Sequence, residues 1–65
     1  MDNITIIFKG GNAYVCRGTA LLLTFYLEIL DHGSLINKFD LDFIDAVYVN
    51  GVLKYFKGTR YGEDG

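Results

Sequence analysis

The sequence predicts an α+β domain of the order ββαββ, in which one helix packs on one face of a small antiparallel sheet of about four strands. Three observations lead to this prediction. Residues 50 and 51 are Asn-Gly between β-branched and aromatic runs, residues 10 and 11 are paired glycines after a β-branched run, and residues 20–32 carry apolar side chains at helical spacing. We expect residues 1–60 to form this single domain and residues 61–65 to be a flexible C-terminal tail.

The first hairpin is predicted over residues 3–17. Residues 3–8 are rich in β-branched side chains, which favour a strand, and residues 13–17 return as its partner. Gly10, Gly11 and Asn12 lie between these strands and reach positive φ at little cost, as a tight turn requires. The glycine pair lacks the Lys-Ser/Thr ending of a phosphate-binding loop, so we interpret it as a turn.

The helix is predicted over residues 20–32, with Thr19 able to cap its start and Gly33 placed where helices commonly end. The apolar side chains with helical spacing are Leu22, Phe25, Tyr26, Ile29 and Leu30. All of these except Tyr26 are expected to be buried beneath the helix. A long strand is the alternative, because Leu21, Leu23, Phe25 and Leu27 also alternate. The length of the segment and the stop at Gly33 favour the helix.

The second hairpin follows a short helical turn, which we expect at residues 34–39 with Ser34 as its cap. Residues 43–49 are strand-like. Asn50 and Gly51 then predict a two-residue type I′ turn, the strongest short hairpin signal in the chain. Residues 52–56 form the last strand, which Gly58 ends.

Composition excludes several classes of protein. The chain is 51% hydrophobic and 15% aromatic with a formal net charge of −2, which is unlike a disordered or strongly basic protein. No apolar run reaches the roughly 18 residues of a membrane span. The single Cys16 cannot form an internal disulfide, and Asp2 stands where a signal peptide would be positively charged. We therefore predict a cytoplasmic protein.

No catalytic or metal-binding pattern is visible. Cys16 and His32 are the only residues that could form a thiolate–imidazole pair, and a lone cysteine is more typical of a buried small side chain. They also fall short of the four ligands of a structural zinc site. Asp40, Asp42 and Asp45 lack the glycine and the distant glutamate of a calcium loop. The prediction is a protein that is not an enzyme and holds no metal or cofactor.

A partner-binding surface is predicted from a surplus of apolar residues. Strands carry apolar side chains on both faces, as Ile7 does opposite Ile6, so some of them remain exposed unless a partner covers them. Residues 28–45 also carry five acidic residues against the single Lys38. We predict a contact with a basic site on another protein; the alternative is a solvated strand edge that discourages aggregation. The predicted contact residues are Phe39, Asp40, Asp42, Phe43, Asp45 and Tyr48.

The function expected from these features is that of a small non-enzymatic protein-binding module. In size and style only, the chain resembles the small inhibitors that phages and mobile elements encode, a class that includes anti-CRISPR proteins and inhibitors of host DNA repair. That resemblance implies a viral inhibitor acting in the host cytoplasm. A homodimeric accessory subunit that buries an apolar sheet face is the alternative. A nucleic-acid-binding domain is a weaker alternative, because the chain is acidic despite the basic and aromatic residues Lys54, Tyr55, Lys57, Arg60 and Tyr61.

Overall fold

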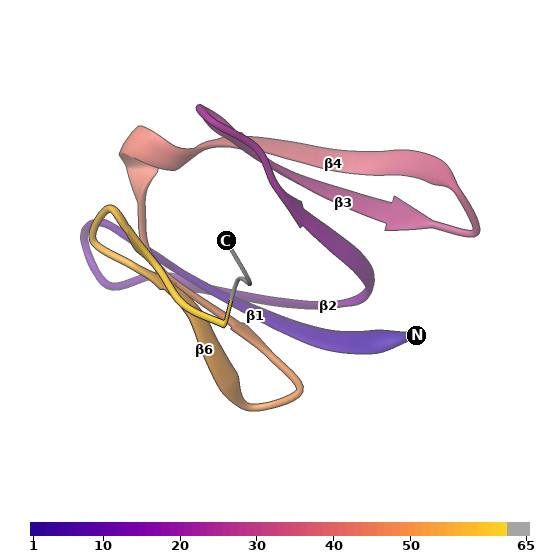
Figure 1. Ribbon diagram of the computed structural model, residues 1–65, viewed down its shortest axis with the longest axis horizontal. Coiled ribbons are helices and arrows are strands. Elements are labelled where there is room, and N and C mark those ends of the chain that lie inside the picture. The colour runs from indigo at the N-terminus through magenta and orange to yellow at the C-terminus, as the bar shows by residue number, and fades with distance from the viewer. Residues whose placement is uncertain (63–65) are drawn as a thin grey trace.

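The computed structural model describes residues 1–62 and shows a seven-stranded antiparallel sheet curled into a half-barrel (Figure 1). The strand order is β4-β3-β2-β1-β5-β6-β7. Residues 1–62 contain no α-helix, so the predicted α+β fold is wrong. The elements are β1 (Asp2–Phe8), β2 (Ala13–Leu22), β3 (Tyr26–Asp31), β4 (Ser34–Asp40), the 3₁₀ helix η1 (Leu41–Phe43), β5 (Ile44–Val49), β6 (Val52–Phe56) and β7 (Thr59–Arg60).

The segment predicted as a helix is the end of β2, a turn and β3. Leu22 pairs with Leu27, and the backbone N–H of Leu23 donates to the carbonyl of Tyr26 at 2.8 Å, so the chain reverses at Thr24 and Phe25. The strand alternative is therefore nearer to the structure than the helix, but the chain forms two strands rather than one, and Leu27 is buried whereas Leu21 and Phe25 are exposed. The turn contains no Gly, Pro, Asn or Asp, and for that reason no residue type marks it in the sequence.

The glycine expected to end a helix instead closes a hairpin. His32 and Gly33 have φ values of 50° and 81°, the left-handed pair that a type I′ turn between two strands requires. The chain then returns as β4, so the short helical turn predicted at residues 34–39 is also wrong. A left-handed glycine suits a helix C-terminus and a hairpin equally well, and the partner strand decides between them.

The two predicted hairpins are confirmed. β1 pairs with β2 around the glycine turn, although β2 extends to Leu22, and β5 pairs with β6 around Asn50 and Gly51. These two residues have φ values of 52° and 78°, as the type I′ prediction requires. Asn50 also joins the turn to the start of β1. Its side-chain oxygen accepts from the backbone N–H of Asn3 at 2.9 Å, and its side-chain nitrogen donates to Asp2 at 2.9 Å.

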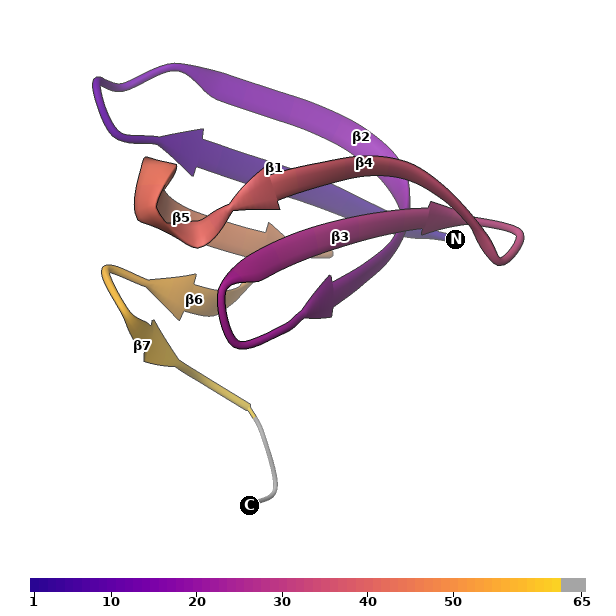
Figure 2. The ribbon, with the colours of Figure 1, turned by 90° about the horizontal axis from the view of Figure 1, so that it is seen from above.

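The curl of the sheet is centred on Gly18. Up to Gly18 β2 pairs with β1, and from Thr19 onward it pairs with β3. Gly18 is buried, and a Cβ atom there would lie 2.4 Å from the carbonyl oxygen of Leu30. Only glycine allows β3 to approach the bend this closely. As a result, β3 and β4 fold over β1, β2 and β5 (Figures 1 and 2).

The concave face of the curled sheet holds the core. β1 contributes Ile4 and Ile6, and β3 contributes Leu27 and Ile29, all with no exposed surface. The rest of the core cluster comes from η1, β5 and β6: Leu41, Ile44, Val47 and Tyr55. Half of the inward-facing set thus lies in β1 and β3, which are not neighbours in the sheet, so burial of these side chains requires the curl.

The predicted core beneath a helix is only partly correct. Ile29 is buried, Leu22 and Leu30 are half-buried, and Phe25 is 70% exposed in the turn. The helical interpretation placed Phe25 on the same face as Ile29, whereas the structure places it where the chain reverses. Of the tail expected at residues 61–65, Tyr61 and Gly62 are exposed and residues 63–65 lie outside the described part of the chain.

Candidate functional site

The acidic segment predicted to contact a partner is divided among different surroundings. Phe39 lies inside the curl, where its ring meets Phe8 and Tyr14 edge-on at centroid distances of 5.4 and 5.8 Å. Asp40 caps η1, because its carboxylate accepts from the backbone N–H of Asp42 at 2.9 Å. These two predicted contact residues therefore have structural roles, whereas the prediction rested on the local negative charge and on the aromatic residues beside it.

Of the remaining members of the segment, Asp42 and Asp45 lie at one pocket and Phe43 is exposed beside it on η1. Asp42 and Phe43 are exposed on η1, and the ring of Phe43 is 67% exposed. Asp42 and Asp45 line a pocket of about 460 Å³ together with Lys9 and Lys57. The acidic side chains therefore share this pocket with two cations of the same chain, and their charge is not isolated as the local sequence suggested.

Tyr48, the last predicted contact residue, belongs to a larger apolar surface on the convex side of the sheet. Ile4 and Ile6 of β1 point into the core, so Thr5 and Ile7 point outward. The strand register places their neighbours on β2, β5 and β6 on the same side. We call this surface the outer-face patch: Ile7, Ala13, Val15, Tyr48, Leu53 and Phe56.

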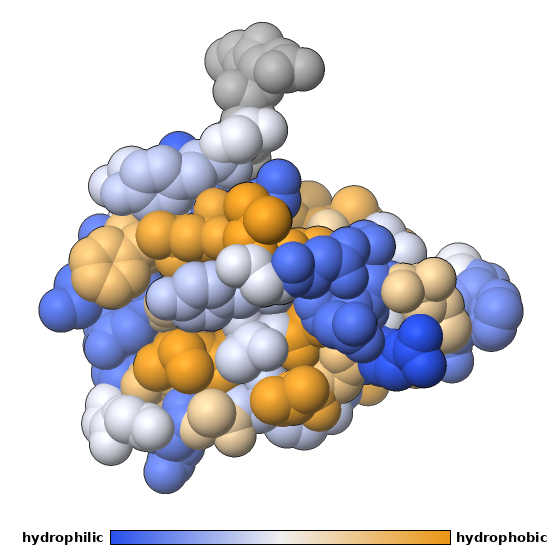
Figure 3. Space-filling view, turned by 90° about the horizontal axis from the view of Figure 1, so that it is seen from below, coloured by the Kyte–Doolittle hydropathy of each residue, from blue (hydrophilic) through white to orange (hydrophobic). Residues whose placement is uncertain are grey.

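The members of the outer-face patch lie around Thr5, which the register places between Val15 and Tyr48, and several of them are accessible. Val15 is 69% and Phe56 42% exposed. Ala46 lies between Ile7 and Phe56 in the register and faces outward, yet it is only 3% exposed. Its larger neighbours must therefore pack over it, which joins the strands of the patch into one surface. Figure 3 shows hydrophobic side chains across this face, with hydrophilic residues gathered at both of its ends.

The border of the patch is polar and positively charged in places. Arg17 is exposed on β2 opposite Asn3, at the end of the patch near the N-terminus. At the other end, Nζ of Lys57 lies 5.4 Å from the centroid of the Phe56 ring, a cation–π arrangement. An apolar centre with aromatic rings and a polar border is the usual composition of a protein–protein interface.

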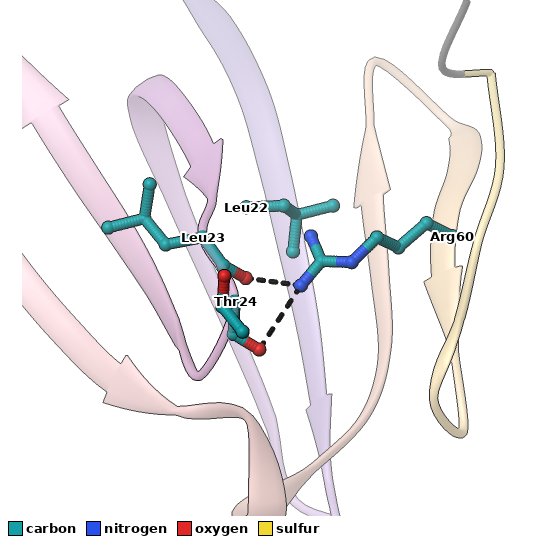
Figure 4. Close-up of a pocket in the computed structure, with 4 residues that line it drawn as sticks. All are labelled: Leu22, Leu23, Thr24 and Arg60. Carbon is teal, nitrogen blue, oxygen red and sulfur yellow. Dashed lines mark hydrogen bonds between the residues drawn. The ribbon is translucent and has the colours of Figure 1, made fainter. Parts of the chain in front are cut away.

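A second surface lies at the open side of the half-barrel, where Arg60 spans from β7 to the turn between β2 and β3 (Figure 4). Nη2 of Arg60 donates to the carbonyl of Leu23 and to that of Thr24, the latter at 3.4 Å. Leu22, Leu23, Thr24 and Arg60 line a pocket of about 520 Å³. Because β7 and this turn are joined by no strand pairing, Arg60 connects two parts of the sheet that the backbone leaves apart.

Cys16 and His32, the two residues considered for chemistry, lie in different surroundings. Cys16 is half-buried on the concave side opposite Ile4, and burial raises the pKa of its thiol. His32 is at the exposed turn between β3 and β4, with Nε2 3.5 Å from Asp31. Within residues 1–62 no group of three His, Cys, Asp or Glu side chains could hold a metal ion. The same part of the chain contains no helix suited to crossing a membrane.

No family model, curated protein or solved structure matches the chain. Function is therefore inferred from the surfaces of the molecule itself, and the outer-face patch is the apolar surface of the β2-β1-β5-β6 part of the sheet, with Val15 and Phe56 exposed.

Sequence reasoning named only Tyr48 among the members of the patch. Val15 and Ile7 were missed as contact residues, although the apolar character of both strand faces was visible. The signal that would have found them is the register: once β1 pairs with both β2 and β5, Thr5 lies opposite Val15 and Tyr48. Pairing between β1 and β5 could not be predicted from the sequence, because the two strands are far apart in the chain.

Proposed function

We propose that the protein is a small non-enzymatic binding module that contacts another protein through the outer-face patch. The observation that carries this proposal is the exposure of Val15 at 69% among apolar neighbours on a sheet face that no other element of residues 1–62 covers. An exposed group of apolar side chains on one face is more typical of an interaction site than of the rest of a protein surface. Tyr48 and Phe56 add the aromatic side chains that usually contribute most of the binding energy.

The size of the protein limits how it binds. Its accessible surface is 4260 Å², and a standard interface covers about 800 Å² on each partner. A contact of that size would occupy about a fifth of the whole surface. The convex face of β2, β1, β5 and β6 is the natural place for it, because the opposite face of the same strands is filled by the core.

The proposal does not set the charge of the partner. Asp42 and Asp45 share a pocket with Lys9 and Lys57, so the acidic segment supplies no single-sign surface. An inhibitor role, which the size and style of the chain led us to expect, remains a prediction that depends on the identity of the partner. A second copy of the chain is the alternative occupant of the patch.

The test uses two exposed positions, one within the outer-face patch and one outside it on β4. Val15→Asp places a charge on the β2 side of the outer-face patch, and Leu35→Asp places the same charge on β4, where Leu35 is 54% exposed. Affinity-tagged wild-type protein and both variants are incubated with cell extract, and the retained proteins are quantified. A partner retained by wild type and Leu35→Asp but lost by Val15→Asp supports the proposal.

Retention of the same proteins by Val15→Asp would refute it, provided that circular dichroism shows both variants to be folded. Analytical ultracentrifugation of the wild-type protein across a hundredfold concentration range separates the alternative. Reversible dimerisation that Val15→Asp abolishes would assign the patch to a second copy of the chain.

A further inference from the structure

The turn between β5 and β6 is joined to the start of β1 by one residue. The backbone N–H of Asn50 donates to the carbonyl of Asn3 at 2.7 Å, and its Oδ1 accepts from the backbone N–H of Asn3 at 2.9 Å. Its Nδ2 donates to Oδ1 of Asp2, also at 2.9 Å. We call these three hydrogen bonds the Asn50 seam. The side chain accepts with one atom and donates with the other, which an amide does and a carboxylate cannot.

Asn50 is also the asparagine whose place in the sequence makes its amide chemically least stable. The chain has asparagines at positions 3, 12, 37 and 50, and only Asn50 is followed by a glycine. An asparagine amide is lost when the next backbone nitrogen attacks Cγ, and the side chain that follows hinders this attack. Gly51 is exposed, and no atom lies within 4 Å of the position that a Cβ would take there. Neither a side chain of its own nor a neighbouring segment therefore hinders the Gly51 nitrogen.

The folded protein restrains this reaction. Ring closure brings Cγ of Asn50 onto the nitrogen of Gly51. Both polar atoms attached to Cγ are held by β1, so that movement breaks the hydrogen bonds to Asp2 and Asn3. The seam is exposed and lies at the end of the β1–β5 pairing, next to the pair of Ile4 with Val49. Because the end of a ladder opens locally without global unfolding, the reaction rate depends on how often the seam opens.

We propose that Asn50 is a deamidation site and that its conversion permanently opens the Asn50 seam. In the first step the Gly51 nitrogen bonds to Cγ, the bond from Cγ to Nδ2 breaks, and ammonia leaves with the proton of the Gly51 N–H. The product is a succinimide ring. Water then opens the ring, because its hydroxyl adds to one ring carbonyl and its other proton goes to the Gly51 nitrogen. Addition at Cγ yields aspartate, and addition at the main-chain carbonyl yields isoaspartate.

Either product disrupts the seam. Aspartate at position 50 has no donor for Asp2, and it places a second carboxylate where the present contact spans 2.9 Å, so the two like charges repel. Isoaspartate carries the main chain through the former side chain and adds one carbon to a two-residue turn. That addition disturbs the pairing of Val49 with Val52. The start of β1 is then released from β5, and refolding cannot restore the lost amide.

The first experiment follows the chemistry by mass. Native protein and protein in concentrated urea are kept at mildly alkaline pH, and tryptic peptides are analysed by mass spectrometry, with isoaspartate detected by enzymatic methylation. Asn50 should be the first of the four asparagines to be converted, about 10-fold more slowly in the native protein than in urea, as a reaction limited by local opening requires. In urea, Gly51→Ala should slow the conversion several-fold, because only the hindrance at the attacking nitrogen differs there. An unmodified Asn50, or equal rates in the two samples, would overturn the proposal.

The second experiment tests the effect of the product on the seam. Asn50→Asp supplies aspartate directly and should raise the unfolding equilibrium constant about 10-fold, through a lost donor and a repelled carboxylate. Asp2→Asn leaves two amides that can still form a hydrogen bond, so its stability should stay close to that of the wild type. The double variant returns a donor at position 2 and an acceptor at position 50, and it should regain most of the loss.

Amide exchange locates the change. The backbone N–H groups of Asn3 and Asn50 both donate across the seam, so they should exchange faster in Asn50→Asp and in aged wild-type protein, and slow again in the double variant. An Asn50→Asp variant as stable as the wild type, or a double variant no more stable than Asn50→Asp, would refute the role of the seam. The outer-face patch contains none of these residues, so either result leaves the proposed function untouched.

Discussion

Replacement of Gly18 by alanine should destabilise the protein strongly, because the bend in β2 leaves no room for a Cβ atom. That atom would lie 2.4 Å from the carbonyl oxygen of Leu30 and 3.2 Å from Cγ2 of Ile29. An ordinary van der Waals contact begins at 3.4 Å, so β2 and β3 would have to separate by about 1 Å. The contacts in question are with backbone, which cannot turn aside as a flexible side chain can.

The expected loss of stability has two sources, the steric overlap at Gly18 and the weaker pairing of β2 with β3. Overpacking of this kind costs about 1–3 kcal/mol, and weakening the adjacent strand pairing adds about 1 kcal/mol. A domain of this size without disulfides or metal has a free energy of unfolding of only about 3–5 kcal/mol. With a urea dependence of about 1 kcal/mol per molar, the unfolding midpoint of Gly18→Ala should fall by about 2–4 M.

Urea unfolding, followed by circular dichroism and by tyrosine fluorescence, measures this loss of stability. Tyrosine is the fluorescent probe because the chain has no tryptophan. Gly51→Ala is the matched control: Gly51 has a φ of 78° and no atom within 4 Å of its would-be Cβ, so that variant carries backbone strain of about 1–2 kcal/mol without a steric contact. If Gly18→Ala loses no more stability than Gly51→Ala, the close approach of β3 is not what requires glycine at the bend.

Other perturbations test the remaining parts of the fold. Phe25→Ala should lower the free energy of unfolding by less than about 1 kcal/mol, since the ring is 70% exposed, whereas Leu27→Ala should lower it by about 2–5 kcal/mol; the reverse order in thermal melts would restore the helical interpretation. Arg60→Ala should speed amide exchange in the turn between β2 and β3, with Arg60→Lys intermediate; unchanged exchange in both would show that the carbonyl contacts contribute nothing. Because burial raises the pKa of Cys16, its thiol should react with disulfide reagents at pH 8 more slowly than free cysteine and regain the free rate in urea; equal rates in folded and unfolded protein would contradict its burial.

The hairpins could be predicted because their turn residues, Asn and Gly, adopt positive φ more readily than other residue types do. Asn50 and Gly51 both need positive φ between two β-branched runs, and a type I′ turn follows from that requirement alone. Lys57 and Gly58 have the same geometry, with φ values of 47° and 92°, and produce β7. From the sequence, Gly58 alone was interpreted, as the end of a strand. Lysine rarely adopts positive φ, so Lys57 did not indicate a turn.

The helix was predicted wrongly because the local pattern fits two periods. Residues 20–30 are almost all apolar, so spacings of two and of three to four residues both find matches. The arrangement is decided by Leu27 and Ile29, which pack against Ile4 and Ile6 across the curl. The local periodicity of a sequence carries no information on contacts between segments that are distant in the chain. The same holds for the candidate site, where Val15 and Tyr48 lie on either side of Thr5 only because β1 pairs with both of their strands.

The pairing of β1 with β5 has a consequence for the order in which the molecule is made. Ile4 lies opposite Val49, so the central strand of the sheet waits for a partner that a ribosome adds only after β2, β3 and β4. During that interval one edge of β1 is open and its apolar side chains are uncovered, a state in which nascent β-proteins aggregate most readily. Pairings between such distant segments also slow refolding, into the range of about milliseconds to seconds. When β5 is complete, Asn50 donates to Asp2 and accepts from the backbone N–H of Asn3, and these contacts hold the end of β5 to the start of β1.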